Sequence, residues 1–259
     1  MLDWLRRRRR QKILAQQVPA HWQPWLQRLW FWSTLAPEER AKLADLAKVF
    51  VAEKNWEGCG GLAMQDEIQV TIAAQMAWLV LGLPDQYFDR VLSILVYPDA
   101  YLAPEVEPTP GGVVLHGEAA LEGQAWYRGP VILSWRDVRR GGQGNQTGRN
   151  VVLHEFAHQL DMLNGAHVDG VPVIDAPQFA ERWLQVTRRA FRDLQRRCDA
   201  GFHTVLDCYG ATSPEEFFAV ATEAFFQRAP RLQAEDPELY AVLAEFYRQD
   251  PAGRVTARP

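Results

Sequence analysis

Apolar residues recur every three or four positions through both ends of the chain, which is the spacing of helices with one buried face. The first such stripe is rich in tryptophan and is typical of a packed core: Trp22, Trp25, Leu26, Leu29 and Trp30. Pro37 starts a second helix that runs to about Glu53, since proline is favoured at the first helical position. Asp66 starts a third, buried helix, which ends near Leu81 before Gly82. Four later helices are predicted over residues 151–163, 177–200, 214–228 and 237–249.

The middle of the chain follows a different pattern. Three short apolar runs, one of them rich in β-branched residues, predict strands over residues 91–97, 113–116 and 130–135. Three prolines between Tyr101 and Gly112 predict a loop, and the glycine-rich run 141–145 predicts a flexible one. Together these elements predict an α+β fold that is mostly helical and has a small mixed sheet.

The linkers carry no strong boundary signal, so we expect a single domain over residues 19–250, with an N-terminal helical part packed on the rest. The run Arg6–Arg10 precedes this domain. Like charges repel and resist folding, which predicts a disordered basic tail over residues 1–18. The alternative is that this arginine run binds weakly, through its charge, to anionic lipid or to an acidic protein. Residues 251–259 are expected to form a short C-terminal tail.

Composition narrows the class of protein. The 259 residues are 47% hydrophobic and carry a net charge of −4, so neither nucleic acid nor an anionic membrane is expected as the main partner. A membrane-spanning helix needs about 20 apolar residues, and no apolar run in this sequence is that long. No secretion signal follows the basic run, and a cytoplasmic protein is expected. The cysteines are odd in number and lack paired spacing, which predicts free thiols in a reducing compartment: Cys59, Cys198 and Cys208.

The segment VVLHEFAHQLDML, residues 151–163, contains the pattern H-E-x-x-H. Residues four apart lie above one another on a helix, so His154 and His158 can bind one metal ion together. Glu155 lies one step round the helix, where it can reach a water molecule at that ion but not easily the ion itself. Two ligands and a general base on one helix indicate a zinc hydrolase with one zinc per chain.

A catalytic zinc takes a third protein ligand. The class that uses H-E-x-x-H-x-x-G-x-x-H is excluded, because Asp161 and Asn164 occupy its last two fixed positions. The other class takes a glutamate from a later helix, and Glu216 and Glu223 lie seven residues apart on one helical face. Glu216 also fits a capping box with Ser213, in which it bonds back to the Ser213 amide, so spacing leaves this choice open. The remaining histidines lack ligand spacing and are expected to be surface residues: His21, His116, His167 and His203.

These residues resemble a known family. HEFAHQLD at 154–161 and YGATSPEEFFAVATEAFF at 209–226 are similar to the Mlc titration factor A family of bacterial zinc peptidases. The likeness extends to ILVYP at 94–98 and GPVILSW at 129–135, and it covers most of residues 35–250. The fold of that family resembles the catalytic domain of anthrax lethal factor, so the resemblance implies a zincin-like metallopeptidase fold.

The resemblance also implies a role for each matching residue. It implies zinc ligands at His154, His158 and Glu216, and a general base at Glu155. It implies Tyr209, seven residues before Glu216, as a hydroxyl near the reacting carbonyl.

Two further acids and one strand become candidates for supporting roles. Glu223 is then a candidate for orienting a ligand histidine from behind. Asp161 is either a second such residue or one with a solvent-exposed or helix-local role. An extended peptide is expected to pair with the sheet at Val131–Ser134.

By resemblance, the protein is a cytoplasmic enzyme that cleaves short peptides with aminopeptidase character and binds a glucose-responsive transcription repressor. Aminopeptidase character rests on the resemblance alone, because residues 61–65 read GLAMQ and lack the amine-binding signature G-x-M-E-N. The alternative function is a regulatory protein that sequesters the repressor, with peptidase activity secondary. Glu155 favours the enzyme, since binding alone needs no base there.

Overall fold

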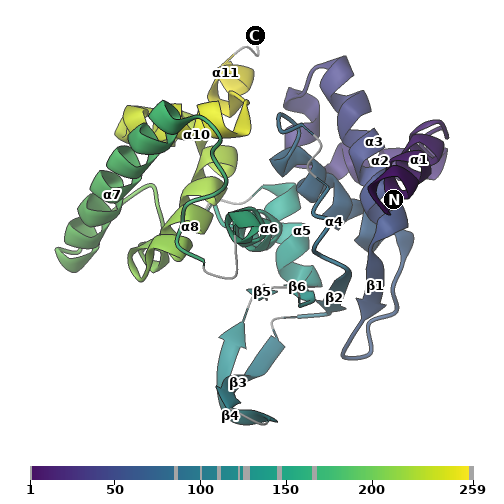
Figure 1. Cartoon of the computed structure of the whole chain (residues 1–259), viewed down its shortest axis with the longest axis horizontal. Coiled ribbons are helices and arrows are strands. Elements are labelled where there is room, and N and C mark those ends of the chain that lie inside the picture. Colours follow the sequence, from purple (N-terminus) through teal and green to yellow (C-terminus); the bar gives the residue numbers. More distant parts are fainter. Residues whose placement is uncertain are drawn as a thin grey trace.

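The structure, a computed structural model, describes residues 2–84, 87–99, 101–109, 112–121, 123–124, 129–144, 148–164 and 168–256. Within these ranges the chain is mostly helical with a small sheet, which confirms the predicted α+β class. Helix α6 (Val151–Asp161) lies at the centre of the molecule, between an N-terminal and a C-terminal group of helices (Figure 1).

The N-terminal helices build a core on α4, whose residues are buried on almost every side. The predicted tryptophan stripe contributes to this core, where Trp22 and Leu26 are buried. Trp78 of α4 stacks on Phe31 with 3.8 Å between ring centroids. The elements of this group are α1 (Leu2–Leu14), η1 (Ala20–Trp22), α2 (Gln23–Arg28), η2 (Trp30–Thr34), α3 (Pro37–Glu53) and α4 (Asp66–Leu79).

Helix α1 replaces the disordered tail that was predicted over residues 1–18. Its Arg10 is buried, 2.7 Å from Glu53 of α3, and also pairs with Asp89. Acids contributed by distant parts of the chain therefore offset the repulsion within the arginine run, and the segment packs as a helix against α3.

The central sheet has the strand order β1-β2-β6-β5. The first three strands are parallel, with Ile94 opposite Val131, and β5 is antiparallel to β6. A mixed sheet was predicted and is confirmed. The strands are β1 (Asn55–Gly58), β2 (Ser93–Tyr97), β5 (Gly123–Gln124) and β6 (Val131–Ser134).

Two more strands form a separate antiparallel pair, β3 (Tyr101–Thr109) with β4 (Gly112–Leu121). The loop predicted from Tyr101 to Gly112 is therefore wrong over β3. Its prolines lower strand propensity locally, but pairing with β4 decides the conformation, and a register shift follows Pro104.

The glycine run does not form the predicted flexible loop, because Gly141 and Gly142 are buried in α5 (Trp135–Gln143). A Cβ at Gly141 would lie 2.8 Å from the side chain of Asn150, and one at Gly142 would lie 2.8 Å from Leu29. These glycines let α5 approach its neighbours closely, including the residue that caps α6. Asn145 lies outside the described residues.

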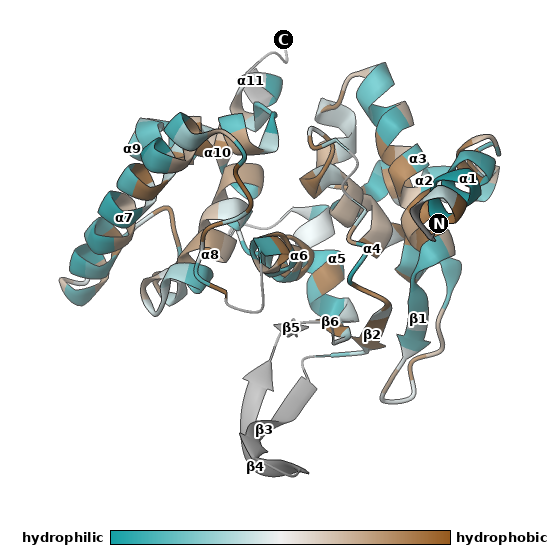
Figure 2. Ribbon diagram, in the orientation of Figure 1, coloured by the Kyte–Doolittle hydropathy of each residue, from teal (hydrophilic) through white to brown (hydrophobic). Residues whose placement is uncertain are grey.

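The C-terminal helices flank α6 on its other side (Figure 1). Hydrophilic residues predominate on α7, whereas α8 is largely hydrophobic and buried (Figure 2). The predicted tail from residue 251 begins as a helix whose Ala252 is buried. In the part of the chain that the structure describes, no helix is long and apolar enough to cross a membrane. The elements are η3 (Met162–Asn164), α7 (Pro177–Asp199), η4 (Cys208–Ala211), α8 (Pro214–Gln227), α9 (Ala229–Glu235), α10 (Pro237–Tyr247) and α11 (Pro251–Thr256).

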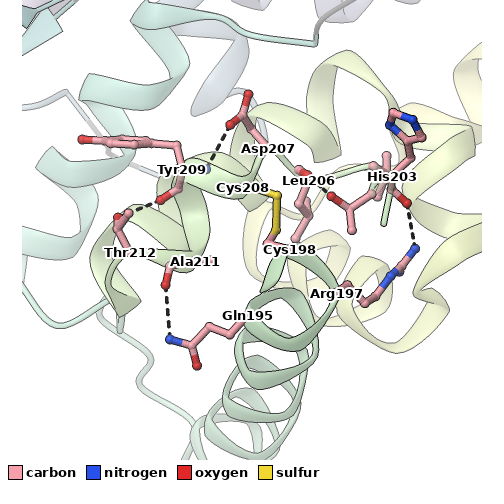
Figure 3. The surroundings of a disulfide bond; sticks show 12 residues. Gln195, Arg197, Cys198, His203, Leu206, Asp207, Cys208, Tyr209, Ala211 and Thr212 are labelled. Atoms are coloured by element: carbon pink, nitrogen blue, oxygen red, sulfur yellow. Dashed lines mark hydrogen bonds between the residues drawn. A yellow bond between two sulfur atoms is a disulfide. The ribbon is translucent and has the colours of Figure 1, made fainter. Parts of the chain in front are cut away.

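Cys198 and Cys208 form a disulfide between the last turn of α7 and the start of η4 (Figure 3). The expectation of three free thiols is therefore wrong for this pair, while Cys59 is free. The chain reverses direction after α7, which brings the two Cα atoms within 5.8 Å across a separation of ten residues. That approach depends on the turn between the two helices, and cysteine spacing alone does not reveal it.

Candidate metal centre

Helix α6 is fixed at its first turn by Asn150. The side-chain oxygen of Asn150 accepts hydrogen bonds from the amides of Val152 and Leu153, each at 3.1 Å. Such a cap satisfies amides that have no partner inside the helix, so it determines where the helix begins. From that start, His154 and His158 lie one turn apart, with 4.9 Å between their ring centroids.

Helix α8 brings a carboxylate to these two histidines. Ser213 caps the helix by accepting from the Glu216 amide at 3.4 Å, and Pro214 occupies the first turn. The Glu216 carboxylate lies against the histidines: Oε2 is 3.1 Å from His154 Nε2 and 3.6 Å from His158 Nε2. The backbone of Glu216 thus takes part in the cap while its side chain reaches α6.

Three potential ligand atoms form a small triangle. The two imidazole Nε2 atoms are 3.3 Å apart, and the Glu216 oxygen is 3.1 and 3.6 Å from them. Ligands held tetrahedrally at about 2.0–2.1 Å from an ion lie about 3.3 Å from one another. The separations therefore fit a tetrahedral metal ion with one position left for another molecule. Within the described ranges, His154, His158 and Glu216 are the one group of this kind.

Glu223 lies on the same face of α8 as Glu216, about two turns further along, and supports the triangle from behind. Its Oε1 lies 2.8 Å from His154 Nδ1, and its Oε2 accepts from the Asn150 amide. With the imidazole hydrogen on Nδ1 and donated to Glu223, the Nε2 lone pair of His154 faces the other two ligands. The same carboxylate thus links the cap of α6 to a ligand of the candidate site.

Sequence reasoning missed a further member of this network, Gln75. It is fully buried in α4, where its Oε1 accepts from the Asn150 side chain at 2.8 Å. Its amide donates to the carbonyl of Val138 at 3.3 Å. The available signal was a glutamine that interrupts the mainly apolar run 70–83. Gln75, Asn150 and Glu223 form a continuous hydrogen-bonded path from α4 to His154.

Replacing Glu223 with glutamine should weaken metal binding without abolishing it. The amide can still accept one hydrogen bond, but the negative charge behind His154 is gone, and such outer contacts typically contribute about 10–100-fold in affinity or activity. Competition with a chromophoric chelator measures the affinity, and Glu215→Gln on the same helix is the matched control. Unchanged affinity in the Glu223 variant would contradict this role.

Glu155 lies on α6 with only 3% of its surface exposed. Its Oε2 atom is buried and has no hydrogen-bond partner among the residues that the structure describes. Burial raises its pKa to about 8. The positive charge of His154 lowers this pKa, and the negative charges of Glu216 and Glu223 raise it. A carboxyl group that titrates near neutral pH is suited to accepting and returning a proton.

The histidine–carboxylate contacts shift two more groups. Burial alone would lower the pKa of His154, but its hydrogen bonds with Glu216 and Glu223 raise it well above the ordinary value. Burial would raise the pKa of Glu216, but the hydrogen bonds from His154 and His158 hold it well below the usual range. These contacts therefore favour the protonated form of His154 in the metal-free site.

Metal uptake should accordingly release protons at pH 7 and weaken as the pH falls. His154 is protonated below its raised pKa, so acid stabilises the metal-free form, whereas a ligand imidazole must be neutral. Calorimetric titrations in buffers of different ionisation enthalpy measure the number of protons released. Uptake without proton release, with an affinity independent of pH between 6 and 8, would contradict this reading.

Tyr209 approaches the triangle from η4. Its ring centroid is 6.1 Å from that of His154, and 51% of the residue is exposed. Burial, together with the carboxylates of Glu216 and Glu155, raises the pKa of Tyr209 to about 12. The phenol is therefore protonated at neutral pH and can donate a hydrogen bond, and it contacts the Glu216 carboxylate.

Asp161 is buried at the end of α6 and holds the segment that leads away from it. Its carboxylate accepts from the amides of Gly170 and Val171, at 2.8 and 3.1 Å. Gly170 has φ +75°, and a Cβ there would lie 2.3 Å from the carbonyl oxygen of Pro214. Asp161 is thus neither solvent-exposed nor bonded to a ligand histidine, and it fixes this segment against the first turn of α8.

The other histidines stay apart from the triangle. His21 pairs with Asp66 at 3.2 Å on the surface. His203 is exposed in the loop after α7 (Figure 3). His167 and the side chain of His116 lie outside the described residues.

Comparison with known proteins identifies the family of this chain. The family described as glucose-regulated metallo-peptidase M90 matches residues 4–248. The uncharacterized protein slr2042 of Synechocystis is 37% identical over 252 residues, which cover 96% of this chain and 90% of that protein. Mlc titration factor A of Yersinia pestis and that of Yersinia pseudotuberculosis are each 32% identical over 219 residues, covering 84% of this chain and 80% of theirs. The resemblance predicted from the motifs is confirmed, and the chain belongs to the glucose-regulated metallopeptidase M90 family.

Proposed function

We propose that this protein is a zinc-dependent peptidase that hydrolyses short peptides with aminopeptidase character, on a zincin-like fold. The observation that carries the proposal is the Glu155 carboxyl, buried without a partner among the described residues on the helix that supplies two of three converging ligands. A purely structural ion needs no such base. Membership of a metallopeptidase family supports the same conclusion.

His154, His158 and Glu216 would hold the ion. Two imidazoles and one carboxylate are a ligand set that zinc takes in catalytic sites, with one position left open. When bound, zinc would supply Lewis acidity that activates a water molecule and polarises the peptide carbonyl.

The chain's own residues would move the protons. Glu155 accepts a proton from the attacking water and passes it to the leaving amine. Its pKa of about 8 applies to the site without a cation, and a nearby positive charge lowers the pKa of a carboxyl. The Tyr209 phenol donates a hydrogen bond to the oxygen on which negative charge develops.

The substrate backbone would pair with the sheet at β5. The expected pairing along Val131–Ser134 is wrong, because β6 is already hydrogen-bonded to β2 on one side and to β5 on the other. Among the described residues, β5 is the last strand of the sheet on that side, and it lies beside α6. An extended peptide added there would run past the candidate site.

A panel of amino-acid p-nitroanilides, each with and without an N-acetyl group, tests this function. Hydrolysis that is lost with chelator, and that prefers the free amino group, is the expected result. Equal rates on blocked and free substrates would exclude aminopeptidase character. Absence of chelator-sensitive hydrolysis on amide substrates, including a mixed peptide library, would exclude the peptidase.

Tyr209→Phe should lower kcat by about 10²-fold with little change in KM or metal content, because the phenol acts on charge that develops only in the transition state. Steady-state kinetics with metal analysis of the same sample measures this. An unchanged kcat would leave Tyr209 a packing residue.

A second candidate function is the sequestering of a transcription repressor in the cytoplasm. The support is the name of the Yersinia relatives, Mlc titration factor A. Since binding needs no general base, Glu155→Gln should bind such a repressor as tightly as the parent. Loss of binding in that variant would tie the interaction to the catalytic site.

A further inference from the structure

Helix α1 is fixed to the rest of the molecule through one side. Arg10 is buried there, and its guanidinium carbon lies 4.0 Å from the centroid of the Tyr87 ring. At the end of the helix, the buried ammonium of Lys48 donates to the carbonyl of Leu14 at 3.2 Å and to that of Gln16. Turning α1 about its axis would break these buried polar contacts, so the structure determines which side of the helix faces solvent.

The opposite side of α1 places two large apolar side chains among cations. Trp4 is 59% exposed and Leu5 is 51% exposed. Residues 4, 8 and 12 lie above one another on a helix, and residue 5 lies beside them. The guanidinium carbon of Arg8 is 5.4 Å from the centroid of the Trp4 ring. Trp4, Leu5, Arg8 and Lys12 therefore form one solvent-facing surface at the edge of the N-terminal helices, the outer face of α1 (Figure 1).

The positive charge on and beside this outer face is not neutralised by the protein. Residues 6–12 contain six cations and no acid. The cations on the inner side pair with Asp89, whereas Arg7, Arg8 and Lys12 are exposed and have no acidic partner among the side chains that the structure describes. The net charge of −4 for the whole chain conceals this local excess. Charges further away than the Debye length, about 8 Å in physiological salt, oppose an anionic partner only weakly.

We propose that the outer face of α1 docks the protein on an anionic lipid surface. The two apolar side chains would enter the boundary between headgroups and acyl chains, and the cations would lie against the lipid phosphates. Exposed Trp and Leu beside Lys and Arg are the composition of helices that lie in a membrane interface. A nucleic acid or a polyacidic segment would pair with the cations but leave Trp4 and Leu5 in water. Docking of this kind is independent of the peptidase function proposed above.

The attachment should be reversible and sensitive to salt. Each Lys or Arg near an anionic membrane strengthens binding by about fivefold, and this contribution falls within a Debye length. Sedimentation of the full chain with vesicles measures the partition coefficient. The parent should bind vesicles of phosphatidylcholine and phosphatidylglycerol, should not bind phosphatidylcholine alone, and should dissociate as salt is added.

Removing the cations should weaken this binding. We expect Arg7→Gln/Arg8→Gln/Lys12→Gln to lose at least about 10-fold in partition on the anionic vesicles. The matched control removes the same charge from three exposed positions on the C-terminal helices: Arg188→Gln/Arg192→Gln/Arg231→Gln. The control should bind like the parent, because those cations lie outside α1.

Removing the apolar pair separates insertion into lipid from adsorption by charge. Trp4→Ala/Leu5→Ala should lose at least about 10-fold on the same vesicles, since its cations remain but the apolar area that leaves water is smaller. Val173→Ala/Phe202→Ala removes exposed apolar groups elsewhere and is the control. Thermal midpoints should match that of the parent, because these variants keep Arg10 and Lys48. Lipids with brominated acyl chains should also quench the tryptophan emission of the parent, a readout that needs no variant.

Several results would overturn lipid docking. They are absence of binding to the anionic vesicles, equal binding to phosphatidylcholine alone, equal losses in the matched controls, and absence of quenching by the brominated lipids. Unchanged binding of Trp4→Ala/Leu5→Ala would reduce the contact to adsorption by charge and would contradict insertion. Tighter binding of an oligonucleotide or of polyglutamate than of the vesicles, at the same salt, would assign the outer face to that polymer instead.

Discussion

Glu155→Gln should retain metal and fold but lose turnover by about 10²–10⁴-fold, the usual contribution of a general base. The amide is close in shape to the carboxyl, yet it cannot take a proton from water. Because Glu155 Oε2 has no hydrogen-bond partner among the described residues, the exchange breaks no contact that the structure shows there. The measurement is kcat on the best p-nitroanilide, with metal analysis of the same sample. Glu181→Gln, on the exposed part of α7, is the control. Parental rates in the Glu155 variant would mean that another group is the base.

Glu216→Gln should lose most of its bound metal at ordinary metal concentrations. Two histidines alone hold an ion weakly. Residues that contact a ligand rather than the ion, such as Glu223, typically contribute up to about 100-fold in affinity. The loss in affinity in Glu216→Gln should be larger than that. The helix should survive, because Ser213 caps α8 through the backbone amide of Glu216 and not through its carboxylate. Metal content and the thermal midpoint, each with and without added metal, measure the effect. If Glu216→Gln binds metal like the parent while Glu223→Gln does not, the two glutamates have been assigned in the wrong order.

The sequence predicted the elements whose signals are local. Pro37 and Pro214 mark first turns, and the helices that start there, α3 and α8, run as predicted to within a residue. The spacing of His154 and His158 placed both on one face of α6, because helical geometry alone determines that relation.

Elements that depend on distant partners were not predictable in this way. The arginine run folds because Glu53 and Asp89 neutralise Arg10. Gly141 lies in a helix and not in a loop because α5 approaches Asn150 so closely that only a residue without a side chain fits there. The disulfide exists because the turn between α7 and α8 brings Cys198 and Cys208 together. Each outcome is set by tertiary packing that no short window of sequence contains.

The choice between Glu216 and Glu223 shows the same limit within the site. Both lie on one face of α8, so spacing could not separate them, and in the structure both approach the same histidine. Glu216 lies near Nε2 of His154 and Glu223 near Nδ1, so the two carboxylates occupy opposite sides of one imidazole ring. The distinction between candidate ligand and supporting residue is made by which nitrogen each one faces.

A zinc titration of chelator-stripped protein, followed by peptide hydrolysis, tests the central claim most directly. If His154, His158 and Glu216 form one catalytic zinc site, the rate should be near zero in the stripped protein. It should rise linearly with added zinc and level off at one equivalent per chain. Full activity in protein shown to be free of metal, or a restored rate in Glu216→Gln equal to that of the parent at one equivalent, would contradict this account.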